Sequence, residues 1–154
     1  MVEILRDMGA EIRWEGETLV SRASKLHGLR VDCAQVPDLV PILAVAMAAA
    51  EGESRITGAA RLRIKESDRL SAMAAALTAA GADVSELPDG LIIRGGKRLH
   101  AAKIEGCNDH RIVMAMTMAS EIADGELMIT DAEATAKSAP AFWREFEHLG
   151  GLAR

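Results

Sequence analysis

The stretch Leu77–Val84, LTAAGADV, repeats the pattern of Leu5–Ile12, LRDMGAEI, at an offset of 72 residues. The same offset relates further pairs: LVSR (residues 19–22) to LIIR (residues 91–94), Asp38 to His110, and Lys65 to Lys137. Self-similarity at a fixed period indicates a duplicated supersecondary unit. We therefore expect two copies of one α/β unit, roughly residues 1–65 and 66–137, followed by a terminal helix over residues 138–150.

Hydrophobic periodicity predicts helices that alternate with strands and hairpins within each copy. The expected helices cover residues 2–12 (the end of a helix), 37–53, 66–82, 109–126 and 138–151; the hairpins cover 11–22 and 82–95; the strands cover 29–33, 54–57, 61–64 and 126–130. Asp38 is the natural N-cap of the helix over 37–53, Gly52 its stop, and Ser138 the cap of the last helix. The helix over 37–53 is apolar nearly all round and should be buried.

Composition excludes several classes of protein. The 154 residues are 49% hydrophobic and 27% charged, which excludes disorder, and the net charge of −5 gives no overall attraction to nucleic acid or anionic membranes. Cys33 and Cys107 lack metal-ligand spacing, so we expect two small buried hydrophobes in a reducing cytoplasm. The apolar run at residues 40–50 is too short to span a membrane. We expect the methionines Met47, Met73, Met114, Met116 and Met118 to fill the core.

Charged residues gather where the expected helices begin. A helix N-terminus offers free N–H groups and the positive end of a dipole, so added cations strengthen its preference for an anion. If rotation relates the repeats, these helix starts converge on one cleft that fits a phosphate or carboxylate ester. The residues concerned are Asp38, Lys65, Glu66, Ser67, Asp68, Arg69, Asp109, His110, Arg111, Lys137 and Ser138.

Each of these residues also has a purely structural interpretation. Asp38 can be only a helix cap, and the charges at residues 65–69 can form a solvated helix face. His110 can be a histidine of the core with Asp109 as a helix cap beside it, and Lys137 can be an ordinary surface lysine. Their recurrence at equivalent points of the repeat favours a site. Two carboxylates, Asp38 and Glu66, suit a base and an acid. The sequence lacks a Walker loop, a GxGxxG motif and an HExxH motif.

Three blocks carry a resemblance to a known family: RLRIKESDRL at residues 61–70, NDHRIVMAM at 108–116 and AKSAPAFW at 136–143. Together they closely resemble the C-terminal part of the EPSP synthase family, the 3-phosphoshikimate 1-carboxyvinyltransferases. The resemblance covers essentially the whole chain. It implies the enolpyruvyltransferase fold, an inside-out α/β architecture of repeated βαβαββ units. The chain would be a partial C-terminal domain, about two of its three units.

The resemblance also implies an activity and residue roles. The family transfers enolpyruvyl from phosphoenolpyruvate to the 5-hydroxyl of shikimate 3-phosphate and releases phosphate, through addition and then elimination. Asp38 resembles the proton acceptor at the shikimate hydroxyl, and Glu66 the group that handles the methylene proton. The resemblance further implies that Lys65 contacts shikimate 3-phosphate and that Arg69 and Arg111 bind phosphoenolpyruvate. It also implies that His110 is an active-site histidine beside these arginines and that Lys137 lies near the phosphate of phosphoenolpyruvate. Arg61 departs from the family, which often has Asn there, so that contact and the response to glyphosate stay open.

The resemblance implies no metal and no organic cofactor, and a cytoplasmic enzyme whose cleft is completed by its N-terminal domain. We expect neither nucleic acid nor membrane as a partner. The chain alone is then expected to be inactive or nearly so. Two other functions stay open: a non-catalytic anion-binding or assembly module of the same fold, and a relative of the UDP-N-acetylglucosamine enolpyruvyltransferases.

Overall fold

The computed structural model describes residues 1–154 and contains five α-helices, four short 3-10 helices and eight strands. In chain order these are α1 (Val2–Asp7), β1 (Glu11–Glu15), β2 (Thr18–Arg22), β3 (Arg30–Asp32), η1 (Pro37–Leu39), α2 (Val40–Ala49), β4 (Gly52–Thr57), η2 (Ala60–Ile64), α3 (Arg69–Ala79), β5 (Asp83–Leu87), β6 (Gly90–Gly95), β7 (Leu99–Ile104), α4 (His110–Ala119), η3 (Ser120–Ile122), β8 (Ala123–Ile129), η4 (Ala132–Lys137) and α5 (Phe142–His148).

One complete βαβαββ unit occupies the middle of the chain. Its four-stranded sheet has the order β3-β4-β6-β5, in which β3 and β4 are parallel and β6 is antiparallel to both of its neighbours. α2 follows β3, and α3 follows β4, before the hairpin β5–β6 closes the unit. This confirms the expected α/β fold of βαβαββ units. The sheet draws strands from both sides of residue 65, so its hydrogen-bonded unit runs from Arg30 to Gly95.

The repeat extends to equivalent strands and to equivalent buried positions in the helices. An offset of 72 carries β1 onto β5 and the buried positions of α2 onto those of α4, for example Leu43 onto Ala115. One extra residue after α4 makes the offset 73 in β8, where Gly52 (φ +91°) corresponds to Gly125 (φ +112°), and the strand pairing gives the same offset in β7. The two parallel strand pairs share a register where Val31 lies opposite Ile56 and Ile104 opposite Ile129, although the register of β7–β8 shifts between His100 and Ala102.

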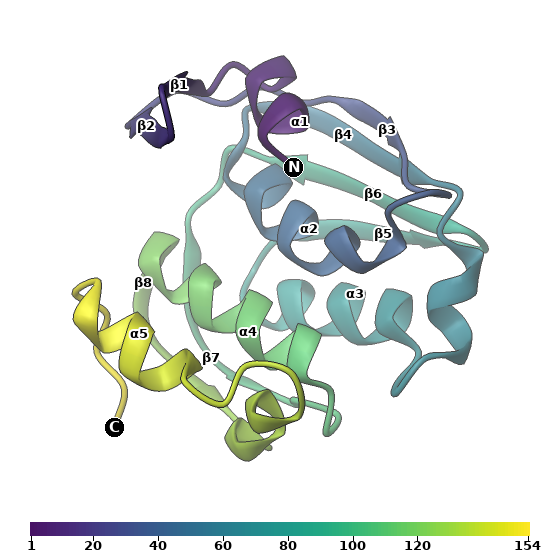
Figure 1. Cartoon of the computed structure of the whole chain (residues 1–154). Helices are drawn as coiled ribbons and strands as arrows, with labels where there is room; N and C mark the ends of the chain where they lie inside the picture. Colours follow the sequence, from purple (N-terminus) through teal and green to yellow (C-terminus); the bar gives the residue numbers. More distant parts are fainter.

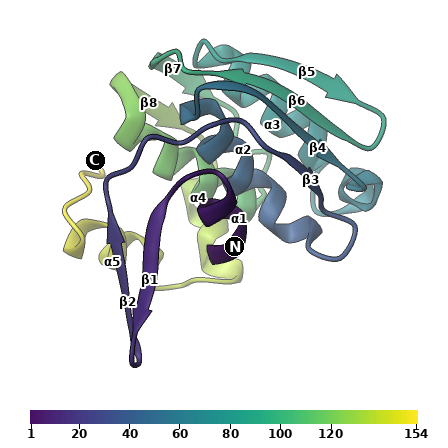
Figure 2. The ribbon, with the colours of Figure 1, turned by 90° about the horizontal axis from the view of Figure 1, so that it is seen from above.

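The helices lie at the centre and the strands outside them. α2, α3 and α4 contact one another, and Figure 1 shows them side by side, with the four-stranded sheet over one side and β7–β8 over the other. The principal core contains 25 buried residues drawn from these helices and both sheets. The hairpin β1–β2 forms a two-stranded sheet of its own and projects from the body (Figure 2). No helix has the length and apolar character needed to cross a membrane.

Several local expectations were wrong, among them the helix over residues 109–126, which ends at Ala119 before β8 begins at Ala123. Residues 61–64 form part of η2 rather than a strand, because only Leu62 is buried while Arg63 reaches across to the carbonyls of the β5–β6 turn. Asp38 does not cap α2, since its carboxylate binds an arginine instead. Gly52 begins β4, and Ser138 ends η4 rather than capping α5.

The expected core is largely confirmed. Met47, Met73 and Met116 are fully buried, but Met118 is 41% exposed because it lies on the outer face of α4. Cys33 is buried and Cys107 is half-buried, and both are free thiols. Burial raises the pKa of the Cys33 thiol, which favours its uncharged form.

Candidate active site

The starts of α2, α3 and α4 meet around one guanidinium group. Arg69, at the first position of α3, is 2% exposed. Its Nε donates to Asp109 Oδ2 at 2.8 Å and its Nη2 to Asp109 Oδ1 at 3.2 Å. The same Nη2 donates to Glu66 Oε2 at 2.5 Å, while Nη1 donates to Asp38 Oδ1 at 2.9 Å. One arginine thus joins carboxylates that lie 31 and 40 residues away in the sequence, and we call this group the Arg69 cluster.

Asp109 is the buried partner of Arg69 and is fully shielded from solvent. Burial opposes its ionisation, but the hydrogen bonds from Arg69, the Arg111 N–H and the Ser67 hydroxyl outweigh burial and hold the pKa of Asp109 below its usual value. Burial likewise lowers the pKa of Arg69, yet Asp109 and the other carboxylates raise it above its ordinary value. Both groups therefore stay charged at neutral pH, as a buried ion pair requires.

A half-exposed rim of mixed charge surrounds this buried pair. The side chains of Asp38 and Glu66 are 45% and 40% exposed, so both carboxylates reach solvent. Lys65 Nζ lies 3.9 Å from Asp38 Oδ1, and Arg111 Nη2 lies 3.8 Å from Asp38 Oδ2. At these distances the cations are paired loosely with Asp38, and an anionic ligand can compete for them.

His110 is buried beside the Arg69 cluster, whereas Lys137 is exposed and bound to a neighbouring loop. His110 is 7% exposed, and its Nδ1 lies 3.8 Å from Glu66 Oε1 without a hydrogen-bond partner. Lys137 is exposed and donates to the backbone and side-chain oxygens of Asn108, in the loop just before α4. The structure therefore brings six of the predicted residues into contact and leaves the seventh, Lys137, on the adjoining loop.

The backbone N–H groups of the helix starts are partly used by the protein itself. Asp68 caps α3 by accepting from the Ser71 N–H, and Asp109 caps α4 by accepting from the Arg111 N–H. Ser67 also binds Asp109, a role that its position in the sequence did not indicate. Charge at this site thus comes mainly from side chains rather than from free helix ends.

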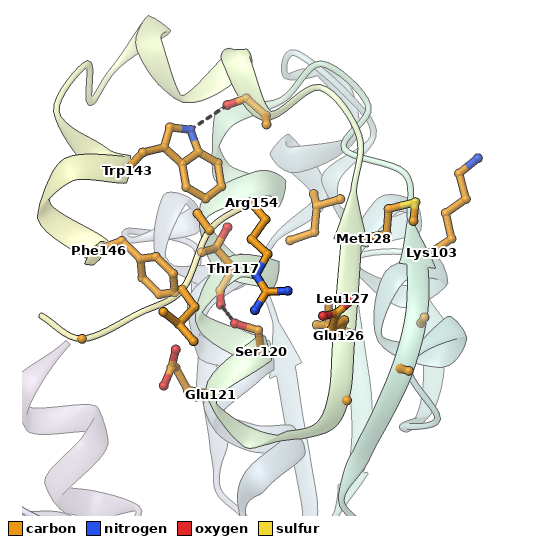
Figure 3. A pocket seen from close by; sticks show the side chains of 18 residues that line it. Lys103, Thr117, Ser120, Glu121, Glu126, Leu127, Met128, Trp143, Phe146 and Arg154 are labelled. Carbon is orange, nitrogen blue, oxygen red and sulfur yellow. Dashed lines mark hydrogen bonds between the residues drawn. The ribbon is translucent and has the colours of Figure 1, made fainter. Parts of the chain in front are cut away.

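A small cavity adjoins the Arg69 cluster, and a larger one lies elsewhere on the molecule. The smaller, about 230 Å³, is lined by Asp38 and Arg111 together with apolar residues of α2 and α4, and it adjoins the Arg69 cluster. The larger, about 1090 Å³, lies away from the cluster between β7–β8 and the C-terminal segment. Figure 3 shows its lining, in which Trp143 and Phe146 lie on one side and the strand that carries Leu127 lies on the other. No group of three or more His, Cys, Asp or Glu side chains is placed to hold a metal ion.

Comparison with known proteins identifies relatives along the whole chain. The 3-phosphoshikimate 1-carboxyvinyltransferases of Clostridium novyi and Methanocella arvoryzae are 45% and 46% identical to it, over 99% and 97% of this chain but only 35% and 36% of theirs. The EPSP synthase structure from Acinetobacter baumannii superposes with a TM-score of 0.87 at 35% identity, covering 97% of this chain and 38% of that one. The enolpyruvyl transferase NikO from Streptomyces tendae, at 20% identity and a TM-score of 0.82, shares the fold.

The chain spans about a third of the length of these relatives. The family model for EPSP synthase (3-phosphoshikimate 1-carboxyvinyltransferase) matches residues 1–146, a range that contains the Arg69 cluster and every predicted site residue. This chain therefore belongs to the EPSP synthase family.

Proposed function

We propose that the chain provides one charged wall of a site that transfers enolpyruvyl from phosphoenolpyruvate to the 5-hydroxyl of shikimate 3-phosphate. The observation that carries this proposal is the Arg69 cluster with its rim: two half-exposed carboxylates, Asp38 and Glu66, are held by a buried ion pair, and two half-exposed cations, Lys65 and Arg111, lie beside Asp38. Such an arrangement can bind an anionic ester and offer proton-transfer groups beside it.

The two carboxylates would divide the proton transfers. Asp38 would accept the proton of the attacking hydroxyl, while Glu66 would deliver a proton to the methylene carbon of phosphoenolpyruvate and later remove one. Protonation of that carbon creates positive character at its neighbour, which nearby carboxylates stabilise. The unpartnered Nδ1 of His110, 3.8 Å from Glu66, supplies a hydrogen-bonding group beside that carboxylate.

The cations would hold the substrates. Lys65 would contact shikimate 3-phosphate, and Arg111 would contact phosphoenolpyruvate, with Lys137 near the phosphate that is released. Arg69 would also meet phosphoenolpyruvate, but its guanidinium already serves three carboxylates. We propose that a substrate carboxylate replaces the exposed partners Asp38 or Glu66, while the buried bonds to Asp109 persist.

The proposed chemistry needs no metal or organic cofactor, and it belongs to a cytoplasmic enzyme whose opposite wall comes from an N-terminal domain. The chain itself would have little or no activity, because ligands that bind in a cleft need both walls to exclude water and to close around them.

Complementation tests the proposal. The purified chain is mixed with a separate polypeptide that comprises the remainder of the Clostridium novyi relative, and phosphate release is measured with phosphoenolpyruvate and shikimate 3-phosphate. We expect no turnover from either polypeptide alone and turnover from the mixture. Turnover by the chain alone would contradict the proposal that a second wall is required.

The same assay separates the other functions. An anion-binding or assembly module would bind the second polypeptide without any phosphate release. An enzyme that acts on a nucleotide sugar would release phosphate with UDP-N-acetylglucosamine instead of shikimate 3-phosphate. Binding of the two polypeptides, measured separately by calorimetry, distinguishes failed assembly from failed catalysis.

A further inference from the structure

Residues 64–67, which we call the 64–67 segment, join η2 to the start of α3 and carry two of the predicted site residues. Arg63 and Asp68 flank this segment, and their side chains close it, since Arg63 Nη1 donates to Asp68 Oδ2 at 2.9 Å. The same Nη1 donates to Glu86 Oε1 on β5 at 2.8 Å. Asp68 is in turn fixed as the N-cap of α3. Arg63 therefore holds both ends of the segment against the β5–β6 hairpin.

The turn of this hairpin supplies the other acceptors of Arg63. Its Nη2 donates to the Leu87 carbonyl at 2.6 Å, and its Nε donates to the Pro88 carbonyl at 2.8 Å. In the same turn Asp89 accepts, through its carboxylate and its carbonyl, from two backbone N–H groups just before η2, at 3.0 and 2.7 Å. The turn thus fixes the chain before η2 and, through Arg63, the chain after it. We call the bonds of Arg63 to Asp68, Glu86 and the turn the Arg63 clamp.

Little else fixes the backbone of the 64–67 segment. No backbone N–H group from Glu66 to Asp68 donates to a backbone oxygen. Ile64 is 86% exposed, so it provides no apolar anchor. The Ser67 hydroxyl donates to Asp109 at 2.9 Å and is the one bond from the segment to the buried ion pair that involves neither Lys65 nor Glu66.

The contacts of Lys65 and Glu66 are the ones that the proposed substrates would disturb. Glu66 is bound to Arg69, and Lys65 lies 3.9 Å from Asp38. If a substrate carboxylate replaces Glu66 on Arg69, the segment loses that anchor at the moment when Glu66 must be in place. The Arg63 clamp persists, because none of its acceptors is a predicted ligand contact.

The clamp occurs only in the copy of the repeat that carries Glu66. At offsets of 72 and 73, Arg63 corresponds to Thr135 and Ala136 of η4. The Thr135 hydroxyl bonds within η4 itself, and alanine has no polar side chain. The equivalent segment, residues 136–139, contains no carboxylate that would need to be positioned.

We propose that Arg63 is a positioning residue of the transfer reaction, which holds Glu66 and Lys65 where they meet their ligands without touching a ligand itself. This inference rests on the function proposed above for those two residues. A group that transfers a proton to one carbon atom must be placed accurately, and a displacement of about 1 Å can cost about 100-fold in rate. Loss of the clamp should therefore lower kcat although the residues that bind and react are all present.

Kinetics of the complemented enzyme test this role. Arg63→Met keeps a long side chain but makes none of these hydrogen bonds, so we expect kcat to fall about tenfold or more. The KM for shikimate 3-phosphate, which Lys65 would contact, should rise, while calorimetry shows that the two polypeptides still assemble. Arg63→Lys keeps the charge without the fork and should restore only part of kcat. Full restoration would point to charge alone and overturn the inference.

Two further variants complete this experiment. Glu86→Gln removes one charged acceptor of the clamp and should lower kcat by less than Arg63→Met, which keeps the inference testable in a milder variant. The matched control Arg94→Met removes an arginine with two ion pairs, to Glu53 and Asp83, at the end of β6 far from the turn. It should leave kcat and KM unchanged. Unchanged kcat in both clamp variants of an active enzyme would overturn the inference.

A double variant separates positioning from a general loss of structure. If Arg63 acts through Glu66, Arg63→Met should lower kcat little in a chain that already carries Glu66→Gln, because the group that it positions no longer transfers protons. A merely structural role predicts the same fold-loss of kcat with and without Glu66→Gln. That result would overturn the inference.

A spin label reports the clamp without catalysis. A nitroxide is attached to Ile64→Cys in a Cys107→Ser chain, where the remaining Cys33 is buried. Adding Arg63→Met should make this label more mobile in the assembled enzyme, whereas a label on Ala136→Cys should not change. Unchanged mobility at residue 64 would overturn the inference. An assembled parent enzyme that releases no phosphate would refute the proposed function and this inference with it, whereas an active parent with unaffected Arg63 variants refutes this inference alone.

Discussion

Replacing Arg69 tests how the Arg69 cluster is held together. Arg69→Met removes four hydrogen bonds to Asp38, Glu66 and Asp109, and leaves Asp109 charged and fully buried. Breaking a buried ion pair on one side costs about 3–5 kcal/mol, because the remaining charge has no partner. We expect the free energy of unfolding to fall by that amount at pH 7.

Urea unfolding, followed by circular dichroism at one protein concentration, measures this loss. Small domains are stable by only about 5–15 kcal/mol, so Arg69→Lys serves as a milder variant that keeps the charge and loses the forked geometry. The double variant Arg69→Met/Asp109→Asn should be destabilised by less than the sum of its single changes, since no unpaired charge is buried in it. A loss below about 1 kcal/mol for Arg69→Met, or strictly additive changes, would refute the reasoning.

Three further predictions concern the site and the core. The pKa of Asp109 is lower in the folded than in the unfolded protein, so its contribution to the free energy of unfolding is complete above the unfolded pKa and is lost as pH falls below about 4. Asp109→Asn should therefore reduce the loss of stability at acid pH, measured by urea unfolding at several pH values. An unchanged dependence of stability on pH would contradict this prediction. A Cβ on Gly106 would lie 2.2 Å from the Thr130 carbonyl oxygen, so Gly106→Ala should cost about 1–3 kcal/mol and lower the thermal midpoint, whereas an unchanged midpoint would show that the loop yields freely. Met116→Ala should cost about 2–5 kcal/mol because Met116 is fully buried, while the exposed neighbour Met118→Ala should be close to neutral; equal losses would refute this difference in packing.

Much of the fold follows from local rules in the sequence. The hairpin over residues 82–95 turns at Pro88-Asp89-Gly90, as predicted, and α3 stops before Gly81, which adopts φ +91°. The repeat itself predicts α1, α3 and both hairpins, because conformational signals such as these recur with it. The segment at 61–64 escapes the same rules, because its alternating pattern indicates a strand while Arg63 is held by contacts 24 and 25 residues away.

The clustering of the candidate residues could be predicted from the sequence, but their arrangement could not, and their roles stay a prediction. Charged residues at equivalent points of a repeat indicate where a site forms, and six of the seven meet in the structure. The sequence does not show that Arg69 is buried or that Asp109 is its partner, because these residues lie 40 positions apart and no periodicity links them. Lys137 illustrates the same limit, since its partner Asn108 lies 29 positions away.

The central claim is that Glu66 and its neighbours in the Arg69 cluster carry the chemistry, and phosphate release by the complemented enzyme tests it most directly. Glu66→Gln keeps the shape of the side chain but removes its proton-transfer function, so we expect kcat to fall by about 100-fold or more while the two polypeptides still assemble. Glu53→Gln, a matched change at an exposed position on β4, should leave kcat unchanged. Full activity of Glu66→Gln in the assembled enzyme would contradict the account.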